Sequence, residues 1–175
     1  MSMVWTLAVC ALAVLASFPL TRTLGRHAGW PLAAIYLVAA AVFWPVASRV
    51  MAGETVAWST PWVPDLGLEL SLRADGIGVV FTAIALLIGA VVLSYSTAYL
   101  SPGRNLTFYL YLVGFTFAMV GLVLADDLIL LFLCWELTSL ASFLLIARSG
   151  YSGEAASMRT LLITFIGGLT LLAAV

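Results

Sequence analysis

One acidic residue, Glu136, is placed where a carboxyl group could handle protons inside a membrane. It lies near the middle of an apolar run over residues 128–147. A helix over this run would carry the carboxyl group roughly 12 Å from its start, at ~1.5 Å per residue. Acidic residues at such depth normally face a bundle interior or a water-filled cavity and mark ion paths. We expect Glu136 to translocate protons or ions, and the alternative is a protonated glutamate that only joins two helices by a hydrogen bond.

Ser139 lies three residues after Glu136, so the two side chains are expected close together on one side of a helix. A serine hydroxyl in that place can donate a hydrogen bond to the carboxylate or hold a water molecule beside it. Ser139 is therefore the expected supporting residue of the Glu136 site.

Three aspartates stand directly before apolar runs. Asp75 precedes one run, and Asp126 and Asp127 precede the run that contains Glu136. An acid at a helix start accepts hydrogen bonds from free N–H groups and complements the helix dipole. We expect these residues to cap and anchor helices, with Arg73 pairing with Asp75. A role of Asp126 and Asp127 in ion access is the alternative.

Other kinds of chemistry lack the residues they need. Cys10 and Cys134 lie in apolar runs and His27 is the single histidine, whereas a metal site needs several such ligands close together. The pair Gly167–Gly168 is not followed by the lysine of a phosphate-binding loop. We expect no metal, no cofactor and no enzymatic site. The net charge of −1 excludes a nucleic-acid partner.

The composition is that of a membrane protein. Hydrophobic residues make up 64% of the chain and charged residues 9%. Ordinary globular domains are about 45–50% apolar and about 25% charged. A helix needs about 20 mostly apolar residues to cross a bilayer. Six stretches of this kind predict an all-α transmembrane bundle: residues 3–20, 30–48, 76–100, 106–125, 128–147 and 155–175.

The arginines predict how these helices are oriented. If the helices alternate in direction, five arginines fall on one side of the membrane: Arg22, Arg26, Arg104, Arg148 and Arg159. Arg49 and Arg73 fall on the other side. Positive loops are usually cytoplasmic, so we expect the N-terminus outside. The first stretch is expected to be a retained helix, because its arginines follow its apolar core, whereas those of a signal peptide precede it.

A small external β-hairpin is predicted at residues 55–73, in the long connection between the second and third helices. Leu68–Arg73 alternates apolar and polar residues, as a half-buried strand does, and Thr55–Trp58 is the expected partner strand. Turn-forming residues stand between them: Pro61, Pro64, Asp65 and Gly67. Trp58 and Trp62 are expected at the membrane interface.

The predicted fourth helix carries small residues at spacings of four, three and four: Gly114, Ala118, Gly121 and Ala125. Small residues that share one face let another helix approach closely. We interpret this stripe as a packing surface.

The run Trp135–Ile146 resembles a known signature. Its sequence, Trp-Glu-Leu-Thr-Ser-Leu-Ala-Ser-Phe-Leu-Leu-Ile, is similar to the fifth helix of the A subunit of the Mrp-type multisubunit Na+/H+ antiporters. That subunit is related to the largest proton-pumping membrane subunit of respiratory complex I, in which Gly-Val-Gly follows the Trp-Glu pair. Leu137–Ser139 resembles the antiporter branch more closely.

The resemblance extends over most of the chain. Four further segments are similar to the same family: Leu72–Gly76, Tyr95–Tyr99, Met119–Asp126 and Thr164–Leu169. The chain departs from the family pattern at Asp127, where Asn is usual, and at Ala147, where Gly is usual. Neither departure touches Glu136.

The resemblance implies a function and a missing partner residue. Residues 1–175 would be the N-terminal portion of a plasma-membrane antiporter subunit, which exchanges protons for monovalent cations such as Na+ together with other membrane subunits. Glu136 would be the family's buried glutamate, coupled to a lysine on a later, broken helix. The chain contains no lysine, and it ends at Val175 inside an apolar run. We therefore expect this domain to be incomplete at its C-terminal end.

Two alternatives remain. The first is a proton-pumping membrane subunit of complex I or of a membrane-bound hydrogenase, in which a redox reaction drives transport. The second is a structural membrane subunit in which Glu136 only holds helices together.

Overall fold

The fold is a bundle of antiparallel helices with a hairpin at one end. The computed structural model describes residues 2–63, 68–101, 105–148 and 151–173. Its elements follow in order: α1 (Ser2–Leu24), a 3-10 turn (Gly25–Ala28), α2 (Gly29–Met51), β1 (Val56–Val63), β2 (Leu68–Ala74), α3 (Gly76–Tyr99), α4 (Leu106–Leu124), α5 (Leu128–Ala147) and α6 (Tyr151–Ala173). The predicted all-α bundle with a small hairpin is confirmed.

The helices are long and apolar enough to cross a membrane. Among the described residues, four continuous helical segments meet this condition: Ser2–Met51, Gly76–Tyr99, Leu106–Leu124 and Leu128–Ala147. The first segment contains both α1 and α2, which fold back on each other at Gly25, where φ is +55°. A shorter apolar helix covers Ser157–Ala173. The chain is a multi-pass membrane protein.

The first helix is longer than the predicted 3–20. Polar residues follow Leu20, but the hydroxyl groups of Thr21 and Thr23 donate to the carbonyl oxygens of Ser17 and Pro19, at 2.6 and 3.0 Å. A threonine that bonds to its own helix in this way needs no water, so its polarity does not end the helix.

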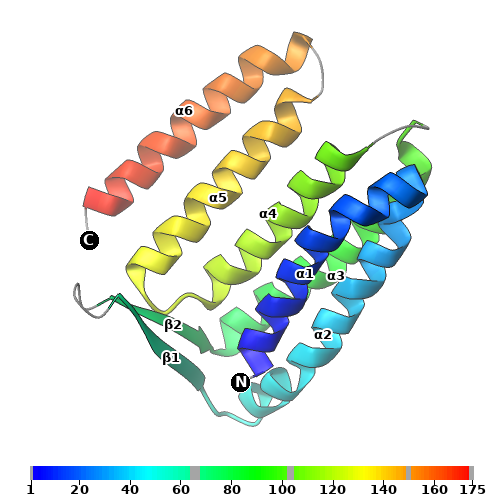
Figure 1. The fold of residues 1–175 in the computed structure, drawn as a ribbon. Helices are drawn as coiled ribbons and strands as arrows, with labels where there is room; N and C mark the ends of the chain where they lie inside the picture. The colour runs from blue at the N-terminus through cyan, green and yellow to red at the C-terminus, as the bar shows by residue number, and fades with distance from the viewer. Residues whose placement is uncertain (1, 64–67, 102–104, 149–150, 174–175) are drawn as a thin grey trace.

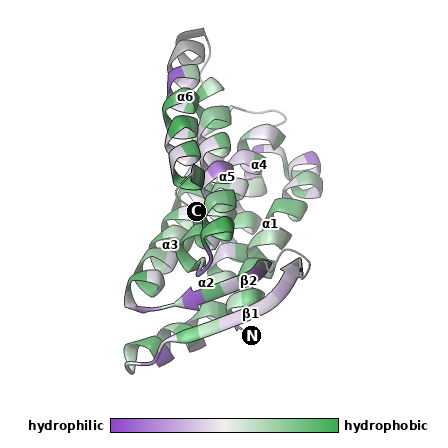
Figure 2. Ribbon diagram, turned by 90° about the vertical axis from the view of Figure 1, so that its left-hand side faces the viewer, coloured by the Kyte–Doolittle hydropathy of each residue, from purple (hydrophilic) through white to green (hydrophobic). Residues whose placement is uncertain are grey.

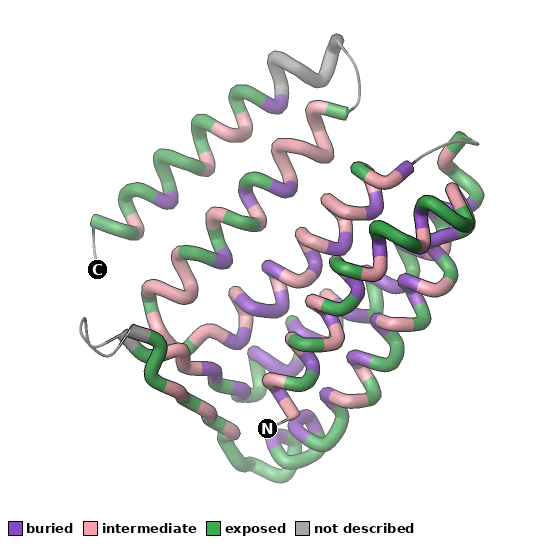
Figure 3. The backbone as a smooth tube through the Cα atoms, in the orientation of Figure 1, coloured by how far each residue is buried: buried purple, intermediate pink, exposed green. Residues whose placement is uncertain are grey.

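Helix α4 is the centre of the bundle. It packs against α1, α3 and α5, while α2 packs against α1 and α3, and α6 packs against α5. Apart from Thr107 near its start, the residues of α4 are buried or half-buried, whereas most described residues from 157 to 173 of α6, at the edge, are exposed (Figure 3). Hydrophobic residues cover the helices, and most hydrophilic residues lie at the helix ends and in the hairpin (Figure 2). This distribution suits a protein whose sides face lipid.

Two buried tyrosines tie the helices together through backbone atoms. The Tyr36 hydroxyl donates to the Val113 carbonyl oxygen at 2.9 Å, which links α2 to α4. The Tyr109 hydroxyl donates to the Arg26 carbonyl oxygen at 2.6 Å, which links α4 to the α1–α2 turn. Both phenol groups thereby obtain a partner away from water.

The hairpin pairs β1 with β2 in antiparallel register, with Trp58 opposite Leu72. Pro61 was expected in the turn, and this prediction was wrong, because Pro61 lies within β1 opposite Glu69, next to a register shift. A proline tolerates such a place because its missing N–H is needed least at an edge or bulge. The other predicted turn residues, at 64, 65 and 67, lie outside the described residues.

The hairpin is anchored to the connection between α4 and α5. Leu72 forms a bridge with Ala125, and the Asp126 N–H donates to the Ser71 carbonyl oxygen at 3.1 Å. Arg73 pairs with Asp126, with 3.7 Å between nitrogen and oxygen, instead of pairing with Asp75 as we expected. Arg73 follows Ser71 on β2 by two residues, so the bond between Ser71 and Asp126 brings Arg73 close to Asp126.

The alternating helices sort five of the seven arginines between the two ends of the bundle as predicted. Arg22, Arg26 and Arg148 lie at the end that holds the α1–α2 and α5–α6 connections, and Arg49 and Arg73 lie at the hairpin end. Arg104 lies outside the described residues. Arg159 is exposed on α6.

Two of the predicted helix caps are confirmed. The Asp75 carboxylate accepts a hydrogen bond from the Gly78 N–H at 2.7 Å at the start of α3. The Asp127 carboxylate accepts from the N–H groups of Ile129 and Leu130 at 2.9 and 3.1 Å at the start of α5. These bonds satisfy N–H groups that have no partner within their own helix.

Replacement of the α5 cap tests its contribution. Asp127→Ala should lower the free energy of unfolding by about 0.5–2 kcal/mol, because free N–H groups at the helix start lose their acceptor. Asp127→Asn, which keeps an acceptor oxygen, is the matched control and should retain most of the stability. Thermal unfolding of the purified subunit in detergent measures both, and equal losses in the two variants would contradict a capping role.

Candidate functional site

Glu136 lies in a groove between α5 and α6. The groove has a volume of about 460 Å³. Apart from Glu136 its lining is apolar: Leu133, Leu137 and Leu140 of α5, and Leu161, Leu162 and Phe165 of α6. Among the described residues, Glu136 is thus the single ionisable side chain that lines this groove between two apolar helix faces.

One oxygen of the Glu136 carboxyl group is buried without a hydrogen-bond partner. This oxygen, Oε1, has no partner among the described residues, and it lies against Gly168 on α6. The residue as a whole is half-buried, because α5 and α6 form the edge of the bundle. A lone buried carboxyl oxygen is uncommon, because a polar group without a partner costs free energy away from water.

We expected Ser139 to support Glu136, by a hydrogen bond to its carboxylate or by holding a water beside it, but its hydroxyl bonds elsewhere. Its hydroxyl is buried and donates to the Trp135 carbonyl oxygen of its own helix at 3.1 Å. A serine hydroxyl has one hydrogen to donate, so in this arrangement it is not available to Glu136. Serine inside a helix often makes this local bond, which competes with bonds to other side chains.

No described arginine pairs with Glu136. The ion pairs in the described part of the chain are Arg49–Glu54, at 2.8 Å, and Arg73–Asp126. The Arg148 side chain bonds to Thr107 and lies over the Phe108 ring, 5.9 Å from its centroid. Arg148 is also twelve residues from Glu136, which corresponds to ~18 Å along a helix.

The three predicted aspartates lie apart from Glu136. Asp75 and Asp127 cap their helices, and Asp126 pairs with Arg73 at the hairpin. Asp127 is nine residues before Glu136, or ~14 Å along the helix. Within the described ranges, no group of three His, Cys, Asp or Glu residues is placed to hold a metal ion.

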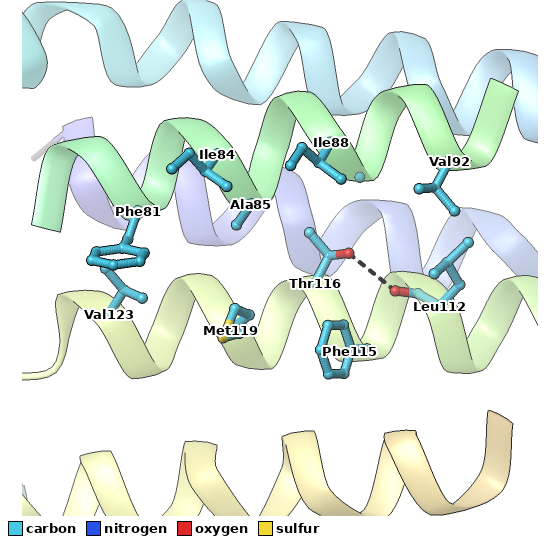
Figure 4. A pocket seen from close by; sticks show the side chains of 11 residues that line it. Phe81, Ile84, Ala85, Ile88, Val92, Leu112, Phe115, Thr116, Met119 and Val123 are labelled. Atoms are coloured by element: carbon cyan, nitrogen blue, oxygen red, sulfur yellow. Dashed lines mark hydrogen bonds between the residues drawn. The ribbon is translucent and has the colours of Figure 1, made fainter. Parts of the chain in front are cut away.

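A second groove, between α3 and α4, offers no ionisable group (Figure 4). Its volume is about 200 Å³, and it is lined mostly by apolar side chains such as Phe81, Ile88 and Met119. Thr116 is its one side chain with a hydroxyl, and this donates to the Leu112 carbonyl oxygen at 3.1 Å. The groove has the character of a lipid-facing surface, and the α5–α6 groove remains the candidate site.

Sequence reasoning missed two residues of the site. Gly168 of α6 receives the Glu136 carboxyl group, and the ring of Phe132 on α5 lies against the same glycine. The sequence excluded Gly167–Gly168 as a phosphate-binding loop and placed the pair in the segment Thr164–Leu169, without assigning either glycine a role. The signal that could have found Gly168 was a glycine pair inside an apolar helix, because such glycines often mark a close approach.

Comparisons with known proteins place this chain in a family. Residues 125–175 match the family described as NADH:quinone oxidoreductase/Mrp antiporter, TM. Over 98% of its length the chain is 38% identical to the putative antiporter subunit mnhA2 of Staphylococcus aureus. It is 40% identical, over 83% of its length, to the Na(+)/H(+) antiporter A1 subunit of Staphylococcus haemolyticus.

A solved structure agrees along almost the whole chain. A chain in the structure of the Mrp complex from Dietzia sp. DQ12-45-1b is 44% identical, covers 99% of this chain and superimposes with a TM-score of 0.91. The chain is a homologue of the N-terminal part of the Mrp antiporter A subunit. The resemblance found in the sequence is confirmed.

This homologue of the Mrp A subunit spans about a fifth of its relatives. The matched regions are 22% and 19% of the two staphylococcal subunits and 19% of the Dietzia chain. The family match begins at Ala125, directly before α5, so it covers the two helices that form the Glu136 groove. The part of the chain with the candidate site is therefore the part shared with the broader family.

The position of α5, and hence of Glu136, depends on its contact with α4. Gly121 lies so close to α5 that an added Cβ would be 2.8 Å from the Cys134 sulfur. Gly114, on the predicted small-residue stripe, has no neighbour within 4 Å of an added Cβ. The stripe therefore forms a close contact at Gly121 and is open at Gly114.

We expect Gly121→Ala to destabilise the subunit by about 1–3 kcal/mol, because its methyl group overpacks the α4–α5 contact. Gly114→Ala on the same helix is the control and should leave the melting temperature unchanged or raise it. Adding Cys134→Ala to Gly121→Ala should restore stability, since the Cys134 Cβ is 3.9 Å from the added methyl. Equal effects of Gly121→Ala and Gly114→Ala would contradict this assignment.

Proposed function

We propose that this chain is the N-terminal portion of an antiporter subunit that exchanges protons for Na+ or another monovalent cation, and that Glu136 binds the transported proton. The observation that carries the proposal is a carboxyl oxygen of Glu136 that is buried without a hydrogen-bond partner among the described residues, in an apolar groove between α5 and α6. The similarity to Na(+)/H(+) antiporter subunits supports the same activity.

The groove would couple proton release to the approach of a positive charge. If Glu136 lost its proton in this arrangement, an uncompensated negative charge would remain beside apolar side chains, at a high cost in free energy. A cation that moves close to the carboxylate offsets that cost. A proton would therefore leave most readily when a cation or a cationic side chain arrives.

The cationic side chain would come from a part of the subunit beyond these residues. Family resemblance implies a lysine on a later helix, and this chain has no lysine. The relatives are about five times as long as the chain, which leaves ample sequence for such a helix. Helix α6 packs against α5 at the edge of the bundle, so a further helix has room to approach beside it (Figure 1).

Glu136→Gln tests the proposal. This substitution keeps the size of the side chain and removes its titratable proton, so Na+-dependent proton exchange should fall by about a hundredfold or more, within the range for a proton-transfer group. The measurement uses everted vesicles that contain the full complex, with the collapse of a pH gradient after addition of Na+ as the signal.

Glu69→Gln is the matched control, because Glu69 is exposed on the hairpin. It should leave exchange unchanged, with equal amounts of assembled complex in both variants. Exchange at a near-normal rate in Glu136→Gln would reject Glu136 as the proton site and leave a structural role.

A redox-driven pump is the second candidate, because the matched family includes NADH:quinone oxidoreductase subunits. The two candidates differ in their source of energy. Purification of the intact complex, followed by identification of its subunits, distinguishes them. Other antiporter subunits would support the exchanger, and NADH- or quinone-oxidising subunits would support the pump.

We also propose that the hairpin lies outside the cell and the α1–α2 turn inside, because more arginines lie at the end that holds this turn. Both native cysteines are buried, so an introduced cysteine can report its side of the membrane. A membrane-impermeant maleimide should label Glu69→Cys in intact cells and His27→Cys only after permeabilisation. The reverse pattern would invert the topology.

A further inference from the structure

The carboxyl group of Glu136 occupies a position on α6 that only a glycine leaves open. An added Cβ at Gly168 would overlap the Glu136 Oε1 atom and lie 3.0 Å from its Cδ. The next neighbour is Cε2 of Phe132, at 3.6 Å, an ordinary contact distance. Gly168 is itself buried. The close contact at this glycine is therefore with the carboxyl group alone.

We propose that Gly168 is a positioning residue for Glu136. Its missing side chain forms a notch on α6 that holds the carboxyl group against the helix backbone, and this sets where the proton is bound. The inference rests on the proposed function of Glu136. It assigns a role to an α6 residue that has no ionisable group.

The neighbouring glycine shows that the notch is specific. Gly167 is exposed and has nothing within 4 Å of an added Cβ. Glycine inside a helix costs about 1 kcal/mol relative to alanine, so each glycine weakens α6. At Gly168 the cost has a local explanation, because the carboxyl group fills the space that a methyl group would take.

Gly168 also differs from the glycines that pack helices. Gly121 faces the Cys134 sulfur, and Gly29 faces the Leu93 carbonyl oxygen and the Thr97 methyl group. Those contacts are between structural groups of neighbouring helices. At Gly168 the facing atom belongs to the one ionisable side chain of the groove.

Gly168→Ala should displace the carboxyl group from the notch toward the open groove. Since a misplacement of about 1 Å in a reacting group can reduce rates up to a hundredfold, we expect exchange to fall by at least about tenfold. Gly167→Ala is the matched control on the adjacent residue and should retain normal exchange. Both are made in the full complex and assayed in everted vesicles, with the amount of assembled complex measured alongside.

Glu136→Asp distinguishes a positioning role of Gly168 from a general role in helix packing. Aspartate at position 136 retracts the carboxyl group by about one C–C bond, ~1.5 Å, and so makes room for a methyl group. Gly168→Ala should therefore have little effect on exchange or assembly in the Glu136→Asp background. An equal loss in the Glu and Asp backgrounds, in exchange or in assembly, would overturn the proposal.

Carbodiimide labelling provides a readout that needs no transport. Dicyclohexylcarbodiimide modifies protonated carboxyl groups that are accessible from lipid, and Glu136→Gln supplies the unlabelled baseline. Labelling of Glu136 should become faster in Gly168→Ala and stay unchanged in Gly167→Ala. If Glu136→Gln exchanged normally, the proposed function would be lost, yet this labelling would still decide whether the notch holds the carboxyl group. Unchanged labelling in Gly168→Ala would overturn the notch.

Discussion

A membrane interior offers no water to polar groups, and this constraint governs the whole structure. Backbone N–H and C=O groups must bond within helices, so irregular backbone is confined to the ends of the bundle. The hydroxyl groups of Thr21, Ser139 and Thr116 bond to carbonyl oxygens of their own helices for the same reason. Among the described residues, two buried side-chain oxygens lack such a partner, the Thr82 hydroxyl and one carboxyl oxygen of Glu136. Only the Glu136 oxygen belongs to an ionisable group, and Glu136 is where we locate function.

Helix α5 carries Glu136 and is held at several points. Asp127 caps its start, and the hairpin bonds through Ser71 to Asp126 just before it. Gly121 of α4 lets Cys134 approach closely on one side. On the other side α6 supplies the groove and the Gly168 notch. The first contacts fix the depth of Glu136, and the notch fixes the direction of its carboxyl group.

The comparisons concern the whole chain and the geometry concerns the surroundings of Glu136, and both support a part in ion exchange. Identity of about 40% with antiporter A subunits extends over most of the chain, which assigns the homology. The chain represents about a fifth of those subunits, so a complete path for ions would need further helices. The apolar groove beside Glu136, at the edge of the bundle, provides a surface that such helices could cover.

The sequence by itself determined the membrane class, the apolar helices, the hairpin and the caps at Asp75 and Asp127, because hydropathy, strand alternation and capping are local properties. It also placed an acid, Glu136, within α5. It did not determine that Arg73 pairs with Asp126, that Pro61 lies within a strand, or that Ser139 bonds to Trp135. Those outcomes depend on which partners are near after packing. The contact between Gly168 and the Glu136 carboxyl group was also decided by tertiary structure alone. A glycine has no side chain whose type could indicate its partner, and only the packing of α6 on α5 brings it to Glu136.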